Sequence, residues 1–156
     1  VCIDVTQRHE HEADRRLRDG VISAVSQGIL ITDPRQPDNP IVFANPASEL
    51  ITGYTAEEMI GRNCRFLQGR DTDAGAVRQI GEAVRTGHDC AVEIVNYRKD
   101  GTPFWNALYI TPVRDDAGIV THFVGVQVDV TERRRLEAEF RQAQKMEAMG
   151  KLAGGV

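Results

Sequence analysis

Four stretches of the chain read as β-strands from their apolar residues, and in the last two the residues also divide between two strand faces with a period of two. The stretches are GILITD (residues 28–33), IVFAN (41–45), CAVEIVNYRKDGTPFWNALYITPVRD (90–115) and THFVGVQVDV (121–130). The segments PRQPDNP and RKDG are rich in turn residues, so each joins two strands into a hairpin. Because the third stretch folds back at its Asp-Gly turn, five strands are expected in all.

Helices are expected between the strands. PASELITG reads as a short helix ending at Gly53, and Thr55 with Glu58 three residues later forms a capping box for the next one. A further helix covers residues 73–85 and stops near Gly87. Strands and helices of this kind predict an α+β domain.

The C-terminal residues 132–156 read as one long helix, with Thr131 as its expected N-cap. The apolar positions Leu136, Phe140 and Ala143 keep the 4-then-3 spacing of a coiled-coil seam. Further along, the seam slips by about one position, to Met146, Met149 and Ala153.

Three amide side chains fall on strand faces that are expected to point inward, and two of them, the asparagines, sit there among aliphatic residues. They are Asn96, Asn106 and Gln127. A buried amide without a partner costs ~1–3 kcal/mol, and each amide offers both donor and acceptor groups. The pattern therefore predicts a flat polar ligand with mixed edges, or trapped water.

The stretch GRNCRFLQGRDTD (61–73) places a single cysteine among polar and basic residues. Cys64, Leu67 and Gln68 have i, i+3, i+4 spacing and are expected on one helical face, with Asn63 and Arg65 beside it. Such a cysteine is a packed apolar side chain, a hydrolase nucleophile, a metal ligand or a group with some other role. The arrangement suits a heteroaromatic ring with a phosphorylated tail.

Composition narrows the classes of function. Of 156 residues, 41% are apolar and 27% charged, and the net charge is −4, which argues against nucleic acid as a partner. No apolar run reaches the ~20 residues that a membrane-spanning helix needs. Three scattered cysteines favour a reducing, cytoplasmic location, and without a CxxC or HxxxH pair no zinc site is expected.

A short repeat suggests how the chain is organised. VCIDVTQR (1–8) matches VQVDVTER (126–133) at five of eight positions, 125 residues apart. We therefore expect residues 1–8 to end an upstream domain similar to the main one and residues 9–24 to form a helical connector. Residues 25–131 would be the main domain and residues 132–156 a coiled-coil linker. The chain also starts without Met, as expected of a piece of a longer protein.

Several motifs together resemble one family. GRNCRFLQG resembles the signature of LOV domains, the flavin-binding blue-light receptors of the PAS superfamily. ITDPRQPDNPIVFAN, IVNYRKDGTPFWN and HFVGVQVDVT agree with it, so that the resemblance covers residues 21–133. It implies a PAS-type five-stranded antiparallel sheet with short helices enclosing a flavin, plus N- and C-terminal helical extensions.

The resemblance also implies roles for single residues. Cys64 would bond reversibly to flavin carbon C4a under blue light, Arg65 would contact the phosphate, and Gln127 would sense protonation of N5. The other residues that would hold or surround the flavin are Asn63, Gln68, Asn96, Asn106, Thr32, Leu30 and Leu108. The implied cofactor is flavin mononucleotide (FMN), with riboflavin or flavin adenine dinucleotide (FAD) as alternatives.

Three positions depart from the family pattern. Gly81 stands where LOV domains often carry a second phosphate-binding arginine. Either Arg78, one turn earlier, is its substitute, or phosphate binding rests on Arg65 alone. Leu30 and Leu108 stand where plant relatives carry Val and Phe, and we expect them to tune the lifetime of the adduct.

The tail FRQAQKMEAMGKLAGGV (140–156) looks like the segment that enters the dimerisation helix of sensor histidine kinases. This resemblance implies a parallel homodimer, a downstream kinase module and a response regulator. The phosphoacceptor histidine is not in the chain, so no autophosphorylation is expected of it. The alternatives are a flavin-binding PAS module that senses redox state and a PAS module that serves dimerisation.

Overall fold

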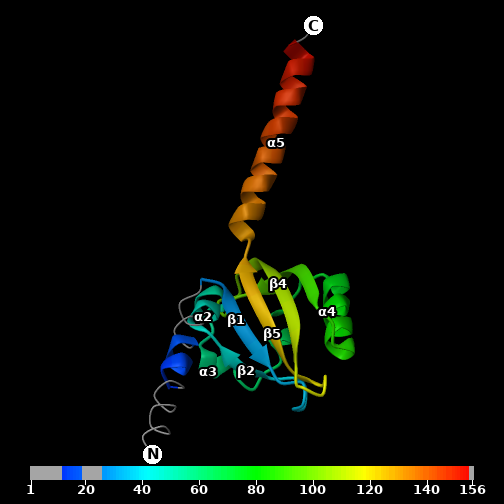
Figure 1. Ribbon diagram of the computed structural model, residues 1–156. Coiled ribbons are helices and arrows are strands. Elements are labelled where there is room, and N and C mark those ends of the chain that lie inside the picture. Colours follow the sequence, from blue (N-terminus) through cyan, green and yellow to red (C-terminus); the bar gives the residue numbers. More distant parts are fainter. Residues whose placement is uncertain (1–11, 19–25, 155–156) are drawn as a thin grey trace, which may run out of the picture.

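In the computed structural model, which describes residues 12–18 and 26–154, five strands form one antiparallel sheet (Figure 1). The strands are β1 (Gly28–Thr32), β2 (Ile41–Ala44), β3 (Cys90–Tyr97), β4 (Pro103–Arg114) and β5 (Val120–Asp129), in the order β2-β1-β5-β4-β3. The predicted α+β class and strand number are therefore confirmed, and the strand bounds agree closely. Residues 12–18 are helical. The expected upstream domain end, residues 1–8, and most of the connector lie outside the described residues.

Four helical elements lie between the strands along the chain, and one long helix follows the last strand. They are α2 (Pro46–Thr52), α3 (Ala56–Met59), the 3-10 helix η1 (Cys64–Leu67) and α4 (Ala74–Thr86), and the C-terminal helix is α5 (Thr131–Gly154). The capping box of Thr55 and Glu58 is present, and Gly53 and Gly87 end their helices at φ values of 78° and 72°. These ends follow from the local sequence because a left-handed residue at a helix C-terminus favours glycine.

The strand alternation places one face of the sheet inside the domain. Leu30, Ile94, Phe104, Asn106 and Gln127 are all buried on this inner face. A small apolar cluster of Leu30, Ile41 and Met59 lies at the β1–β2 side of the domain. The inner face therefore combines aliphatic packing with buried amides, as the sequence pattern predicts.

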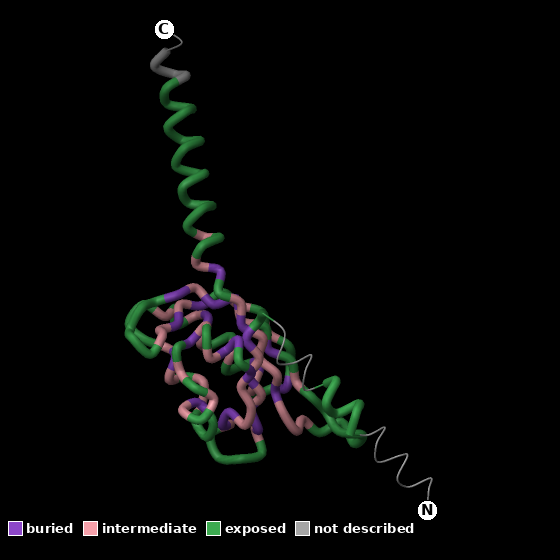
Figure 2. The backbone as a smooth tube through the Cα atoms, turned by 90° about the vertical axis from the view of Figure 1, so that its left-hand side faces the viewer, coloured by how far each residue is buried: buried purple, intermediate pink, exposed green. Residues whose placement is uncertain are grey.

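Helix α5 extends away from the domain, and most of its described length is exposed (Figures 1 and 2). Its exposed apolar side chains are Leu136, Phe140, Met146 and Met149. No helix in the described part of the chain is long and apolar enough to span a membrane.

The predicted N-cap of α5 is wrong. Thr131 is the first residue of the helix, and its hydroxyl group accepts the backbone N–H of Trp105 at 2.9 Å and donates to Asp129 at 2.6 Å. The carboxylate of Asp129 also accepts the backbone N–H of Thr131 at 3.0 Å. The Thr131 hydroxyl group, which local sequence predicts to cap the helix, thus forms a hydrogen bond with strand β4 instead.

Candidate functional site

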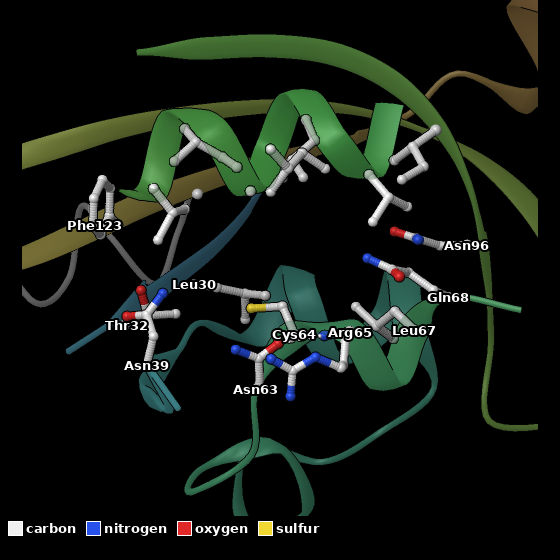
Figure 3. Close-up of a pocket in the computed structure, with 18 of the residues that line it drawn as sticks. Leu30, Thr32, Asn39, Asn63, Cys64, Arg65, Leu67, Gln68, Asn96 and Phe123 are labelled. Atoms are coloured by element: carbon white, nitrogen blue, oxygen red, sulfur yellow. Dashed lines mark hydrogen bonds between the residues drawn. The ribbon is translucent and has the colours of Figure 1, made fainter. Parts of the chain in front are cut away.

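A cavity of about 480 Å³ lies between the inner face of the sheet, η1, α4 and the loop of residues 33–40 (Figure 3). This volume is within the range of ~300–1,000 Å³ typical of small-molecule sites. All ten residues predicted for the site line it: Leu30, Thr32, Asn63, Cys64, Arg65, Gln68, Asn96, Asn106, Leu108 and Gln127. The structure thus brings together residues from β1, η1, β3, β4 and β5, while their roles stay predictions.

Cys64 begins η1, and its side chain lies beside Leu30 at the cavity wall (Figure 3). The residue is half-buried and packs against the cluster of Leu30, Ile41 and Met59. Burial raises the pKa of the Cys64 thiol from its ordinary value of 9.0 to about 11, although Arg65 nearby opposes this shift. At neutral pH the thiol therefore keeps its proton, unlike an activated hydrolase nucleophile.

The 3-10 geometry corrects one detail of the predicted site. Gln68 does not continue a helical face with Cys64, because η1 ends at Leu67 and Gln68 is its C-cap with extended backbone (φ −81°, ψ 155°). Gln68 nevertheless lines the same cavity, on the side of Asn96 (Figure 3). Asn63 is the N-cap of η1, where its side-chain oxygen accepts the backbone N–H of Arg65 at 2.9 Å.

Asn96, Asn106 and Gln127 are buried side by side on three neighbouring strands. Asn106 donates its amide N–H to the side-chain oxygen of Asn96 at 2.9 Å, and Asn96 donates to the backbone oxygen of Val95 at 3.3 Å. Asn106 and Gln127 expose only 0% and 1% of their surface, and neither amide oxygen has a hydrogen-bond partner in the protein. Such unpartnered oxygens are costly unless a ligand or water donates to them.

Two further oxygens without a partner face the same cavity. They are the hydroxyl oxygen of Thr32 and the side-chain oxygen of Asn39. Within the described residues, every buried side-chain oxygen or nitrogen without a partner thus belongs to a residue that lines this one cavity. A ring whose edge carries both N–H and carbonyl groups, and whose tail carries hydroxyl groups, fits this set. These are the groups of a flavin.

Asn39 is a site residue that the sequence did not single out. It lies in the loop between β1 and β2, where Asp38 and Asn39 both have left-handed backbone, with φ values of 66° and 48°. Asn and Asp adopt this conformation more readily than most residues, so the local signal is that of a turn only. Only the folded loop places Asn39 over the cavity.

Arg65 is held by an ion pair at the rim of the cavity. Its two terminal nitrogens donate to the carboxylate oxygens of Asp38 at 2.6 and 2.7 Å, and the side-chain nitrogen of Asn63 donates to the backbone oxygen of Asp38 at 2.7 Å. The Arg65 guanidinium group lowers the pKa of Asp38. The Arg65 guanidinium group, which is expected to contact the phosphate, is therefore paired with the Asp38 carboxylate in this structure.

Helix α4 contributes a different arginine from the one expected. Gly81 lines the cavity, and a Cβ atom built there meets nothing within 4 Å. One turn later Arg85 also lines the cavity, whereas Arg78 does not. The expected substitute for the missing arginine is therefore not at the cavity. In the described part of the chain, no group of three or more metal-binding side chains lies close together.

Comparisons with known proteins identify the family of this chain. The family model of the PAS domain matches residues 26–132. Phototropin-2 of Oryza sativa subsp. japonica is 44% identical over 131 residues, which are 81% of this chain and 14% of that protein. Blue-light-activated histidine kinase 1 of Erythrobacter litoralis is 46% identical over 122 residues, 76% of this chain and 34% of that protein. The chain thus spans about a third or less of these relatives.

Solved structures give the same result. The LOV domain of the Erythrobacter litoralis EL346 blue-light activated histidine kinase superposes with a TM-score of 0.66 at 42% identity, covering 69% of this chain and 98% of that one. The light-state structure of the Aureochrome1 LOV domain superposes with a TM-score of 0.68 at 41% identity, covering 79% and 96%. Fold, cavity and similarity together show that this chain belongs to the PAS domain family and, within it, to the LOV domains.

Proposed function

We propose that this domain is a blue-light sensor in which Cys64 bonds reversibly to FMN and the signal passes through α5 to a histidine kinase module. The observation that carries the proposal is the cavity itself. It holds a protonated thiol at one wall and, among the described residues, every buried side-chain oxygen that lacks a partner. The blue-light receptors among the relatives support the same function.

A flavin bound in this cavity would supply the absorption of blue light and an electrophilic ring carbon, C4a. Cys64 would supply the sulfur that bonds to this carbon and, from its broken S–H bond, the proton for N5, so that no external oxidant or reductant is needed. The raised pKa of Cys64 keeps that proton on the sulfur until light arrives. Leu30 packs beside the cysteine and limits the space in which its side chain moves. The protein thus supplies a neutral thiol in a confined position.

Gln127 would detect the change at N5, which turns from an acceptor into a donor. The Gln127 amide oxygen is buried without a partner, and the amide group offers both donor and acceptor atoms. Rotation of the amide would therefore let the side chain follow the new hydrogen-bond pattern. Such a local exchange of partners is able to shift the position of a larger element.

The route to α5 is short. Asp129 lies two residues beyond Gln127 and binds both the hydroxyl group and the backbone N–H of Thr131, the first residue of α5. On its other carboxylate oxygen Asp129 accepts a hydrogen bond from Arg98 at 2.8 Å. A displacement of β5 at Gln127 would therefore reach the start of the helix through Asp129.

The first turn of α5 also contacts the outer face of the sheet through ion pairs and a stacking interaction. Arg133 and Arg134 both donate to Glu93 of β3, at 2.9 and 2.7 Å, and the Arg134 guanidinium group lies 3.6 Å from the centre of the Trp105 ring. Beyond this turn the exposed apolar residues of α5 would pair with a second copy as a parallel coiled coil. A kinase module and its response regulator would follow in the whole protein.

An absorption spectrum of the purified chain in the dark, after blue light and during recovery tests the proposal. We expect bound flavin, loss of its blue absorption band in light, and recovery in the dark. Cys64→Ala should keep the flavin and abolish the bleaching. Cys90→Ala is the matched control, because Cys90 is a half-buried cysteine that does not line the cavity, and it should bleach normally.

Two results would contradict the proposal. If the purified chain contains no extractable flavin, the remaining interpretation is a PAS module that serves dimerisation only. Flavin that is bound but not bleached by light in the unaltered chain would favour a sensor of redox state.

A further inference from the structure

Gly28 of β1 lies directly opposite Gln127 of β5 in the antiparallel sheet. A Cβ atom built on Gly28 would lie 2.8 Å from the Gln127 side-chain oxygen, 3.1 Å from its Cβ and 3.2 Å from the Cα of Ser48. Real Cβ atoms essentially never have contacts below 3.0 Å, so a side chain at position 28 would require the Gln127 amide, the flexible end of that side chain, to shift from this position. The carboxamide of Gln127 thus occupies the space that a side chain at residue 28 would fill.

The need for glycine here comes from space and not from the backbone. Gly28 is not among the described glycines with positive φ, and its place in a regular strand suits any residue. Gly125, the other glycine that pairs within the β1–β5 ladder, differs from it. A Cβ atom there would meet nothing closer than Leu108 at 3.7 Å, an ordinary contact. The close approach is therefore particular to the Gly28–Gln127 pair.

We propose that Gly28 is a positioning residue that keeps the Gln127 amide in the cavity and leaves it room to rotate. This inference rests on the proposed function, in which the amide exchanges its donor and acceptor groups. Because the oxygen lies over Gly28, rotation moves the amide nitrogen through the same space. A methyl group at position 28 would block both orientations and hold the side chain elsewhere.

Gly28→Ala, produced as the full chain with flavin, tests this role. The readouts are flavin bleaching and the infrared band of the Gln127 side-chain carbonyl, identified as the glutamine band that shifts with isotope-labelled glutamine and is absent from Gln127→Leu. We expect bleaching through Cys64 to persist while the light-induced shift of the Gln127 band is lost. Ile31→Val is the control, because it removes one carbon from the same strand on the outer face, and it should keep the shift. A full shift in Gly28→Ala would overturn the inference.

A second variant covers the case in which Gly28→Ala does not fold or does not hold flavin. Gln127→Asn shortens the side chain by one methylene and withdraws it from position 28. If the collision with Gln127 is the cause, Gly28→Ala combined with Gln127→Asn should bind flavin as Gln127→Asn alone does. A double variant as defective as Gly28→Ala would place the collision at Ser48 and refute the proposal.

An unaltered chain that holds no flavin would refute the proposed function instead. The two failures are therefore distinguishable, since the inference is judged only against an unaltered chain that bleaches and shows the Gln127 shift.

Discussion

Leu30→Val should shorten the lifetime of the light state, and the structure gives the size of the effect. Leu30 exposes 2% of its surface, lines the cavity and packs in the cluster against which Cys64 lies. The substitution removes one carbon atom, which costs ~0.8 kcal/mol of burial plus a small cavity, about 1 kcal/mol in total. For a domain of this size the midpoint of thermal unfolding should fall by ~3–5 °C.

The same missing carbon gives the Cys64 side chain more room. If the light state relies on Leu30 to confine the sulfur, about 1 kcal/mol off the barrier to recovery accelerates it by about fivefold. The assay follows the return of the blue absorption band in the dark, at one temperature and with flavin content matched between proteins. Thermal unfolding of the dark state supplies the stability difference independently.

Ile41→Val separates confinement from general loosening. Ile41 is fully buried in the same cluster but does not line the cavity, so the variant loses one carbon of similar burial. It should unfold at a lower temperature, as Leu30→Val does, and recover at the rate of the unaltered chain. Equal recovery rates for Leu30→Val and the unaltered chain would refute the reasoning, and equal acceleration by both variants would show that stability alone sets the rate.

Three further predictions concern the thiol, the start of α5 and the cavity rim. Folding raises the Cys64 pKa to about 11, whereas the unfolded chain releases this proton near pH 9.0. The free energy of unfolding without flavin should therefore decrease as the pH rises from about 9 to about 11. Thermal unfolding of Cys64→Ala should show a smaller decrease over the same pH range. Trp105→Ala removes the ring on which the Arg134 guanidinium group stacks and should speed backbone hydrogen exchange in the first turn of α5 by about fivefold. An unchanged exchange rate would mean that this stacking does not stabilise the start of the helix. Asp38→Asn leaves the charge of Arg65 uncompensated and should raise the ratio of FMN affinity to riboflavin affinity by about two- to fivefold. Fluorescence titrations with the two flavins measure this ratio, and an unchanged ratio would mean that Arg65 does not contact the phosphate.

Local sequence predicted the elements of this domain well, because their signals are local. Strand alternation, the Thr55–Glu58 capping box and the glycines after α2 and α4 depend on neighbours within a few residues. The site residues were predicted by a different route. The amides Asn96, Asn106 and Gln127 stood out as polar residues on an apolar face, while the roles of Cys64 and Arg65 came from the family resemblance.

The features that sequence did not predict depend on contacts between distant segments. Asn39 reads as a turn residue, and only the fold of its loop brings it to the cavity. Asp38 pairs with an arginine 27 positions away, and neither residue carries a local sign of the other. The space at Gly28 exists because the register of β1 and β5 sets it opposite Gln127. Such relations follow from the pairing of distant strands and from loop geometry, which a pattern within a few neighbouring residues does not show.

Thr131 shows why one wrong local prediction matters for signalling. As an N-cap it would bond only within its own helix, and α5 would begin independently of the sheet. Instead its hydroxyl group joins the backbone of β4 at Trp105 to the carboxylate of Asp129 at the end of β5. The first residue of α5 is thus bound to two strands that both carry cavity amides, Asn106 on β4 and Gln127 on β5. In the proposed signalling, a change in the hydrogen bonds of either amide would therefore have a short path to the helix, and that path would include the contact between Thr131 and Trp105, which local propensity did not predict.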